Sequence, residues 1–81
     1  MGFVPKTIRE PNFGALRIEF SRMRNERGWT YEVLADRSGV TRRTLISIET
    51  GATNGSLDTW FRLAQAFGVP LGELLLPLDS K

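Results

Sequence analysis

The stretch from Trp29 to Gly51, WTYEVLADRSGVTRRTLISIETG, decides the fold. Thr30 is a suitable helix N-cap, because its hydroxyl accepts a hydrogen bond from a backbone N–H that has no partner in the first turn. Residues 33–35, VLA, supply an apolar side, and Gly39 then interrupts the pattern, since glycine takes a left-handed turn conformation without steric cost. Thr41 provides a second N-cap. The stretch therefore predicts two short helices joined by a tight turn.

The second of these helices has two unlike sides. At about 100° per residue, three residues fall on each side, Leu45, Ile48 and Glu49 on the inner one and Arg43, Ser47 and Thr50 on the outer one. Arg42 and Thr44 lie near the N-terminal rim. The inner side is thus apolar with one acid, and the outer side carries hydroxyl and guanidinium groups. This arrangement predicts a helix-turn-helix whose second helix enters the major groove of DNA.

Composition excludes several other classes of protein. The 81 residues suffice for one domain, and a chain of this length buries only about 60% of its unfolded surface, so a partner subunit would add stability. A hydrophobic content of 41% is that of a globular protein. No apolar run reaches the roughly 20 residues of a membrane span, and the N-terminal segment lacks the apolar stretch of a signal peptide. Because cysteine is also absent, we expect a cytoplasmic protein without membrane association.

The missing residue types also bear on catalysis. With neither histidine nor cysteine, the chain lacks the usual general base, the thiol nucleophile and the standard zinc ligands. No pair of carboxylates has a recognisable catalytic spacing. The sequence therefore predicts no enzyme, no bound metal and no cofactor.

Positive charge is distributed unevenly along the chain. The net charge is only +2, yet residues 1–43 hold nine Lys/Arg against five Asp/Glu, and residues 44–81 hold two against four. Nine of the eleven basic residues are arginine, whose planar fork matches phosphates and guanine edges. A GC-rich coding sequence would enrich arginine as well, so charge alone leaves both interpretations open.

The chain divides into an N-terminal arm, residues 1–12, and a helical domain, residues 13–78. Apolar residues at helical spacing predict three further helices, at roughly Phe13 to Arg27, at 57–67, and from Leu71 to about Leu76. Asn12 and Ser56 are suitable N-caps, and the three helices are expected to end at Gly28, Gly68 and Pro77. No strand pattern competes, so the fold class is all-α.

Two alternatives remain for the arm. Either Lys6 and Arg9 lie along DNA, or the arm is a frayed tail or a segment held to the core by Phe3 and Ile8. The sequence favours the second alternative, because terminal segments are commonly frayed or tied down locally.

Three segments carry a resemblance to a known family. They are RMRNERGWT at residues 22–30, LA followed by SGVTRRTLISIETG at residues 34–51, and SLDTWFRLAQAFGVPLGELL at residues 56–75. Through them, residues of about 14–76 resemble the phage repressor/Cro-like, XRE-type helix-turn-helix family. The resemblance implies a compact five-helix bundle, the lambda repressor-like DNA-binding domain, that binds operator DNA as a dimer and regulates transcription.

The resemblance also assigns the DNA contacts. Base edges fall to Thr41, Arg42, Arg43, Thr44 and Ser47, and phosphates fall to Thr30, Tyr31, Thr50, Thr53 and Asn54. Two departures from the family pattern weaken the phosphate assignment. Tyr31 stands where glutamine is usual, and a phenol has a different reach; the loop near Thr53 and Gly55 lacks the usual basic residue and proline.

A structural ion pair is implied as well. In many members of the family an arginine of the first helix pairs with a glutamate of the third, and the matching residues here are Arg24 and Glu49. Glu49 falls on the inner side of its helix, where a half-buried carboxylate needs a partner.

Apolar residues beyond the central core predict a dimer. Phe61 lies off the buried stripe of its helix, and four leucines follow it, Leu71, Leu75, Leu76 and Leu78. Together they add more apolar surface than a small bundle hides, which favours a homodimer interface over simple filling of the core.

The leading hypothesis is a sequence-specific regulator that binds a palindromic double-stranded operator as a dimer. Without a sensor domain its occupancy would follow protein concentration, as in an autoregulatory phage-type repressor or a controller protein of a restriction–modification system. The alternative is an antitoxin-like interaction module whose main partner is another protein. Repression and activation both stay open, and Glu32 and Asp36 are either a contact for RNA polymerase or ordinary exposed acids.

Overall fold

A computed structural model of the chain describes residues 8–81, so Phe3 and Lys6 of the arm lie outside the described residues. The described part is all-α, as predicted. It contains five α-helices and one 3-10 helix: α1 (Phe13–Glu26), α2 (Tyr31–Ser38), α3 (Arg42–Thr50), α4 (Leu57–Phe67), α5 (Leu71–Leu74) and η1 (Leu76–Asp79).

The four longer helices begin where the sequence places their caps. The side chains of Asn12, Thr30, Thr41 and Ser56 each accept a hydrogen bond from the backbone N–H three residues later. Each bond satisfies one of the N–H groups that a helix leaves without an intrahelical partner. Gly39 ends α2 with φ 76°, the left-handed conformation expected of the turn residue.

One predicted helix end is wrong. The first helix ends at Glu26 with Arg27 as its C-cap, in agreement with the approximate prediction. The last α-helix ends at Leu74, and Pro77 does not terminate it but lies in the first turn of η1. Proline fits there because the first N–H groups of a helix have no acceptor within it, so the missing donor costs nothing.

The core takes side chains from all five α-helices. Its largest fully buried side chains are Leu16, Phe20, Leu34, Leu45, Ile48, Leu63 and Leu74. Phe20 meets the ring of Trp60 edge-on, with ring centres 5.8 Å apart, and Trp29 stacks on Phe67 at 5.8 Å. In the described part of the chain, no helix combines the length and the apolar character needed to cross a membrane.

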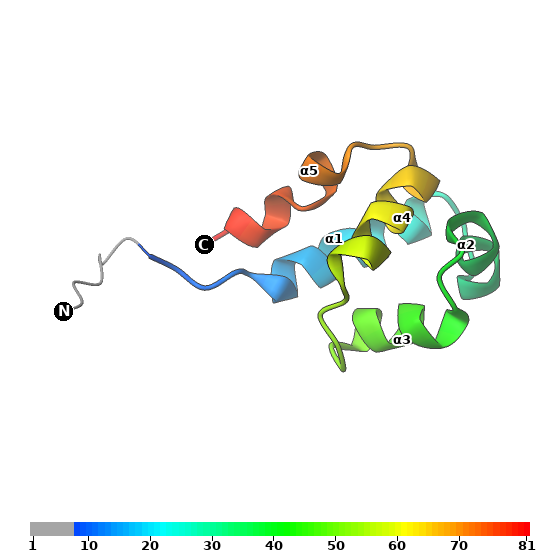
Figure 1. Cartoon of the computed structure of the whole chain (residues 1–81), viewed down its shortest axis with the longest axis horizontal. Coiled ribbons are helices and arrows are strands. Elements are labelled where there is room, and N and C mark those ends of the chain that lie inside the picture. Colours follow the sequence, from blue (N-terminus) through cyan, green and yellow to red (C-terminus); the bar gives the residue numbers. More distant parts are fainter. Residues whose placement is uncertain (1–7) are drawn as a thin grey trace.

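The position of α3 decides which surface is available for binding. Figure 1 shows α3 along one edge of the molecule, with α5 and the C-terminal turn on the opposite side. α3 packs against α1 and α2, while α4 packs against α2 and α5 (Figure 1). One side of α3 is therefore buried in the bundle and the other faces outward.

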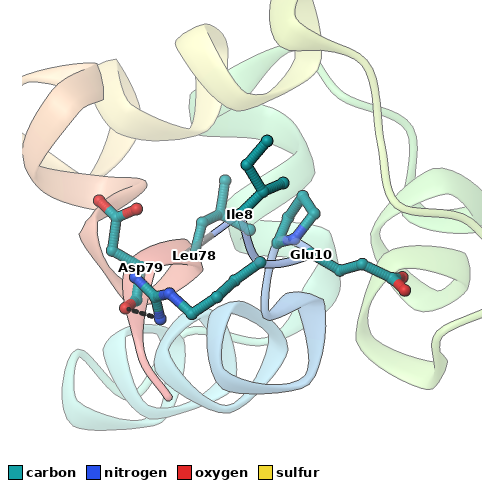
Figure 2. Close-up of a pocket in the computed structure, with 6 residues that line it drawn as sticks. Ile8, Glu10, Leu78 and Asp79 are labelled. Atoms are coloured by element: carbon teal, nitrogen blue, oxygen red, sulfur yellow. Dashed lines mark hydrogen bonds between the residues drawn. The ribbon is translucent and has the colours of Figure 1, made fainter. Parts of the chain in front are cut away.

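The end of the N-terminal arm contacts η1 at the C-terminus. The backbone N–H of Asn12 donates to the Leu78 carbonyl at 2.9 Å, and Arg9 Nη1 donates to the Asp79 carbonyl at 3.0 Å. These segments line an open pocket of about 430 Å³. Figure 2 shows the side chains that line it, with the Glu10 carboxylate pointing away from the others. Ile8 lines the pocket but is 66% exposed, so hydrogen bonds rather than Ile8 hold this end of the arm.

Gly55 controls the loop between α3 and α4. Its φ is +79°, and a Cβ atom there would lie 2.8 Å from Trp60 Nε1, the donor that bonds the Asn54 carbonyl at 2.8 Å. We expect Gly55→Ala to lower the free energy of unfolding by about 1–3 kcal/mol, because alanine is strained at this φ and displaces the indole. Urea unfolding followed by tryptophan fluorescence measures the effect.

Gly72→Ala is the matched control. Gly72 lies in α5 and a Cβ atom there would meet nothing within 4 Å, so alanine is expected to be neutral or stabilising. Equal unfolding midpoints for the two variants would contradict the role assigned to Gly55.

Candidate nucleic-acid interface

The N-terminal turn of α3 is fixed by hydroxyl groups. Thr41 Oγ1 accepts the Thr44 backbone N–H at 3.2 Å and donates to Thr44 Oγ1 at 2.9 Å. Leu45 and Ile48 on the inner side of the helix are buried, whereas Arg42 and Arg43, directly after the cap, are exposed. Charged side chains thus stand at the end of the helix that a helix-turn-helix directs at base edges.

An open pocket separates the outer side of α3 from the start of α4. Its volume is about 410 Å³, and its lining includes Arg43, Thr44, Ser47, Thr53, Ser56 and Thr59. The pocket thereby brings together three residues predicted to contact bases, Arg43, Thr44 and Ser47, and one predicted to contact phosphate, Thr53. Sequence reasoning recognised Ser56 only as a cap and missed Thr59; the position of both in the first turn after the loop was the available signal.

Arg42 and Arg43 have different surroundings. Arg43 lines the pocket and makes no ion pair with any residue of the described range 8–81. Arg42 forms an ion pair with Glu32 of α2, with 2.7 Å between Nε and Oε2. Arg43 therefore has no charged partner among these residues, whereas Arg42 is held by an ion pair with α2.

Hydrogen bonds distinguish the predicted phosphate contacts. The hydroxyls of Thr30 and Thr53 accept backbone N–H groups, at 3.2 and 3.3 Å. The Thr53 hydroxyl can still donate to a phosphate oxygen, whereas the Thr30 hydroxyl also has the Glu32 carboxylate as an acceptor. Thr50 Oγ1 instead donates to the Ile46 carbonyl at 2.9 Å, inside its own helix. The backbone of Asn54 is fixed by the bond from Trp60 to its carbonyl, and its side chain is exposed.

Tyr31 is turned toward the protein. The guanidinium of Arg24 lies 4.4 Å from the centre of its ring. Burial and the nearby Glu49 carboxylate raise the pKa of the Tyr31 hydroxyl. A phosphate contact by this phenol therefore competes with Glu49 for the same group, and the contact implied by the resemblance stays a prediction.

Glu49 lies at the junction of α1, α2 and α3. Arg24 donates to both of its carboxylate oxygens, at 3.1 and 3.0 Å, and Ser21 Oγ donates at 3.3 Å. Arg24 also donates to the carbonyl of Trp29 at 2.9 Å. The side chains of Arg24 and Glu49 are only 13% and 17% exposed, so the pair fixes α3 relative to α1 largely away from water.

The protonation of Glu49 depends on these contacts. Burial by itself would raise the pKa of the carboxyl, but hydrogen bonds from Arg24, Tyr31 and Ser21 outweigh it and the pKa is lowered. Glu49 is therefore charged at neutral pH. Sequence reasoning found the arginine but missed Ser21, which lies one turn before Arg24 on α1.

Sequence reasoning also missed Arg17 of α1. Its guanidinium carbon lies 3.2 Å from where a Cβ atom on Gly51 would stand, next to the C-terminus of α3. The last turn of α3 has no basic residue of its own, and neither does the loop that follows. Arg17 therefore supplies positive charge at this end of the helix. The available signal was its spacing of seven residues from Arg24, on the same face of α1.

The chemistry of this surface is that of hydrogen-bond donors. Guanidinium, hydroxyl and amide groups surround α3, and residues 8–81 contain no group of three side chains suited to hold a metal ion. Planar guanidinium groups and hydroxyls are the groups that recognise base edges and phosphates.

The leucines after α4 are less exposed than a free interface would be. Leu71, Leu75 and Leu78 are partly buried against the core, which accounts for them by the simpler alternative of core filling. Phe61 is 50% exposed and Leu76 is 63% exposed. Of the five residues predicted for the dimer interface, only Phe61 and Leu76 are therefore exposed.

Comparison with known proteins identifies the family. A family model described as helix-turn-helix matches residues 21–74. The chain is 43% identical over 61 residues to an uncharacterised HTH-type transcriptional regulator, y4dJ, of Sinorhizobium fredii, covering 75% of this chain and 79% of that protein. It is 49% identical over 65 residues to an uncharacterised HTH-type transcriptional regulator of Methanothermobacter thermautotrophicus, covering 80% and 94%.

A solved structure is similar over nearly the whole chain. The crystal structure of the hypothetical transcription factor NHTF from Neisseria superposes with a TM-score of 0.71 and 28% identity, covering 93% of this chain and 88% of that one. Its fold, the matching family model and the regulators above all indicate a helix-turn-helix protein. The chain belongs to the XRE-type helix-turn-helix family of DNA-binding transcriptional regulators.

Proposed function

We propose that this protein is a sequence-specific transcriptional regulator that binds a palindromic operator as a homodimer. The observation that carries the proposal is the outer side of α3, where Arg42 and Arg43 are exposed opposite a buried apolar side. An arginine that donates two hydrogen bonds to O6 and N7 of guanine distinguishes that base from the other three.

The proposal divides the surface into reading and holding residues. Base edges are read by Thr41, Arg42, Arg43, Thr44 and Ser47. Phosphates are held by Thr30, Tyr31, Thr50, Thr53 and Asn54. We add Arg17 to the second group, because its guanidinium beside Gly51 supplies the charge that the loop itself lacks.

Dimerisation is proposed to involve Phe61 and Leu76, with Leu71, Leu75 and Leu78 supporting them from the core side. A dimer doubles the number of base contacts, and it links operator occupancy to protein concentration. This linkage suits autoregulation, as in a phage-type repressor or a controller protein of a restriction–modification system.

Selection of bound sequences from a random DNA pool tests the proposed function. The expected result is enrichment of a palindrome whose half-site centres lie about 34–36 Å apart, one turn of the double helix. Recovery of sequences without any shared motif would contradict sequence-specific recognition.

Light scattering tests the dimer. The wild type is expected to be dimeric at tens of micromolar, and Phe61→Ser combined with Leu76→Ser is expected to shift it to monomer, because both apolar side chains leave the interface. Ile18→Ser is the control, since Ile18 is another exposed apolar residue, on α1. A wild-type monomer, both free and on DNA, would count decisively against the proposal.

A further inference from the structure

The ion pair between Glu32 and Arg42 joins the two helices of the helix-turn-helix. Glu32 is the second residue of α2 and Arg42 is the first residue of α3. Of the ion pairs within residues 8–81, only this one and Arg24–Glu49 connect different helices; the others lie within α1 or α4. Its side chains are 67% and 59% exposed, unlike those of the Arg24–Glu49 pair.

The atoms that form the pair leave the end of the guanidinium free. Glu32 Oε2 lies 2.7 Å from Nε of Arg42. The terminal nitrogens Nη1 and Nη2 of Arg42 make no hydrogen bond within residues 8–81, so they can donate in parallel to O6 and N7 of guanine. A side chain that is already held loses less conformational freedom when it binds a base.

We propose that Glu32 is a positioning residue, which holds Arg42 in the orientation needed for base recognition. The inference rests on the proposed function, because it requires that α3 reads DNA. It assigns a role in specificity to a carboxylate on α2 that does not itself touch a base.

The charge state and the exposure of the pair agree with this role. The backbone N–H of Glu32 and the Arg42 guanidinium lower the pKa of the carboxyl, so Glu32 is ionised at neutral pH. Exposed ion pairs contribute little to the stability of the fold, so the Glu32–Arg42 pair is expected to contribute little to it. An effect on recognition with little effect on stability is the expected signature.

Glu32→Gln tests the proposal, with Asp36→Asn as the matched control. Asp36 is also exposed on α2, makes no ion pair within residues 8–81, and its replacement changes the net charge equally. Full-length variants are titrated at one salt concentration against the selected operator and its single-base variants. Both substitutions are expected to raise affinity for all DNA, because each removes a negative charge.

Only Glu32→Gln is expected to weaken discrimination at the base pair that Arg42 reads, by about threefold to tenfold. That base pair is identified with Arg42→Ala, and adding Glu32→Gln to Arg42→Ala is expected to cause no further loss. Unchanged or improved discrimination in Glu32→Gln would overturn the positioning role, and improvement would mean that Glu32 competes with DNA for the arginine.

The same titrations separate this inference from the proposed function. A wild type that prefers no sequence overturns both. A wild type that discriminates, with an Arg42→Ala variant that discriminates equally well, overturns only the role of Glu32.

Discussion

Replacing Glu49 by alanine is expected to lower the free energy of unfolding by about 3 kcal/mol, at the low end of the range for a broken buried ion pair. The substitution leaves the Arg24 guanidinium, only 13% exposed, without its carboxylate. It also removes the acceptor of the Ser21 hydroxyl. The loss is large because an unpaired charge stays largely away from water.

Urea unfolding at neutral pH measures this effect, and Glu26→Ala is the control. Glu26 pairs with Arg22 on the exposed side of α1, so its loss is expected to change stability by no more than about 0.5 kcal/mol. Similar unfolding midpoints for Glu49→Ala and Glu26→Ala would show that the Arg24–Glu49 pair does not hold the three helices together.

The contribution of Glu49 also has a defined pH dependence. Its pKa in the folded protein lies below the ordinary value of 4.5, so the folded state favours the charged carboxylate. The stabilisation is therefore fully present above about pH 4.5 and disappears as the pH falls through the folded pKa. The stability difference between the wild type and Glu49→Ala is expected to shrink over that interval.

Arg43→Ala is expected to remove about 1–3 kcal/mol of discrimination, roughly 5- to 150-fold, at one base pair in each half-site. Arg43 lines the pocket on the outer side of α3, and no carboxylate of residues 8–81 forms an ion pair with its guanidinium. Titration against single-base variants of the operator at fixed salt measures the loss.

Arg22→Ala is the control for the loss of positive charge. Arg22 is exposed on α1 and paired with Glu19 and Glu26, and it is expected to change no base preference. If Arg43→Ala lowers the affinity for all DNA sequences by the same factor, Arg43 contacts phosphates and not a base.

Local signals in the sequence predicted the parts of the fold that depend on neighbouring residues. Thr30 and Thr41 act on backbone groups three residues away, so each cap could be recognised within its own helix. The periodic placement of Leu45 and Ile48 likewise identified the buried side of α3, and with it the exposed side.

Contacts between distant residues could not be predicted in this way. Arg17 reaches Gly51, and Glu32 reaches Arg42, only because the bundle brings different helices together. The same holds for Leu71 and Leu78, whose partial burial depends on how α5 and η1 pack against the rest of the domain. Pairing of side chains across helices is a property of the tertiary structure, which no single segment encodes.

The most direct test of whether α3 reads the DNA sequence is a ratio of affinities. The affinity for the operator is divided by the affinity for random DNA, at one salt concentration, for Arg42→Ala and for Arg43→Ala. Asn54→Ala is the comparison, because a phosphate contact weakens both DNAs by similar factors and preserves the ratio. We predict that the ratio falls in at least one arginine variant and is preserved in Asn54→Ala. If both folded arginine variants keep the wild-type ratio, α3 is not the reading element.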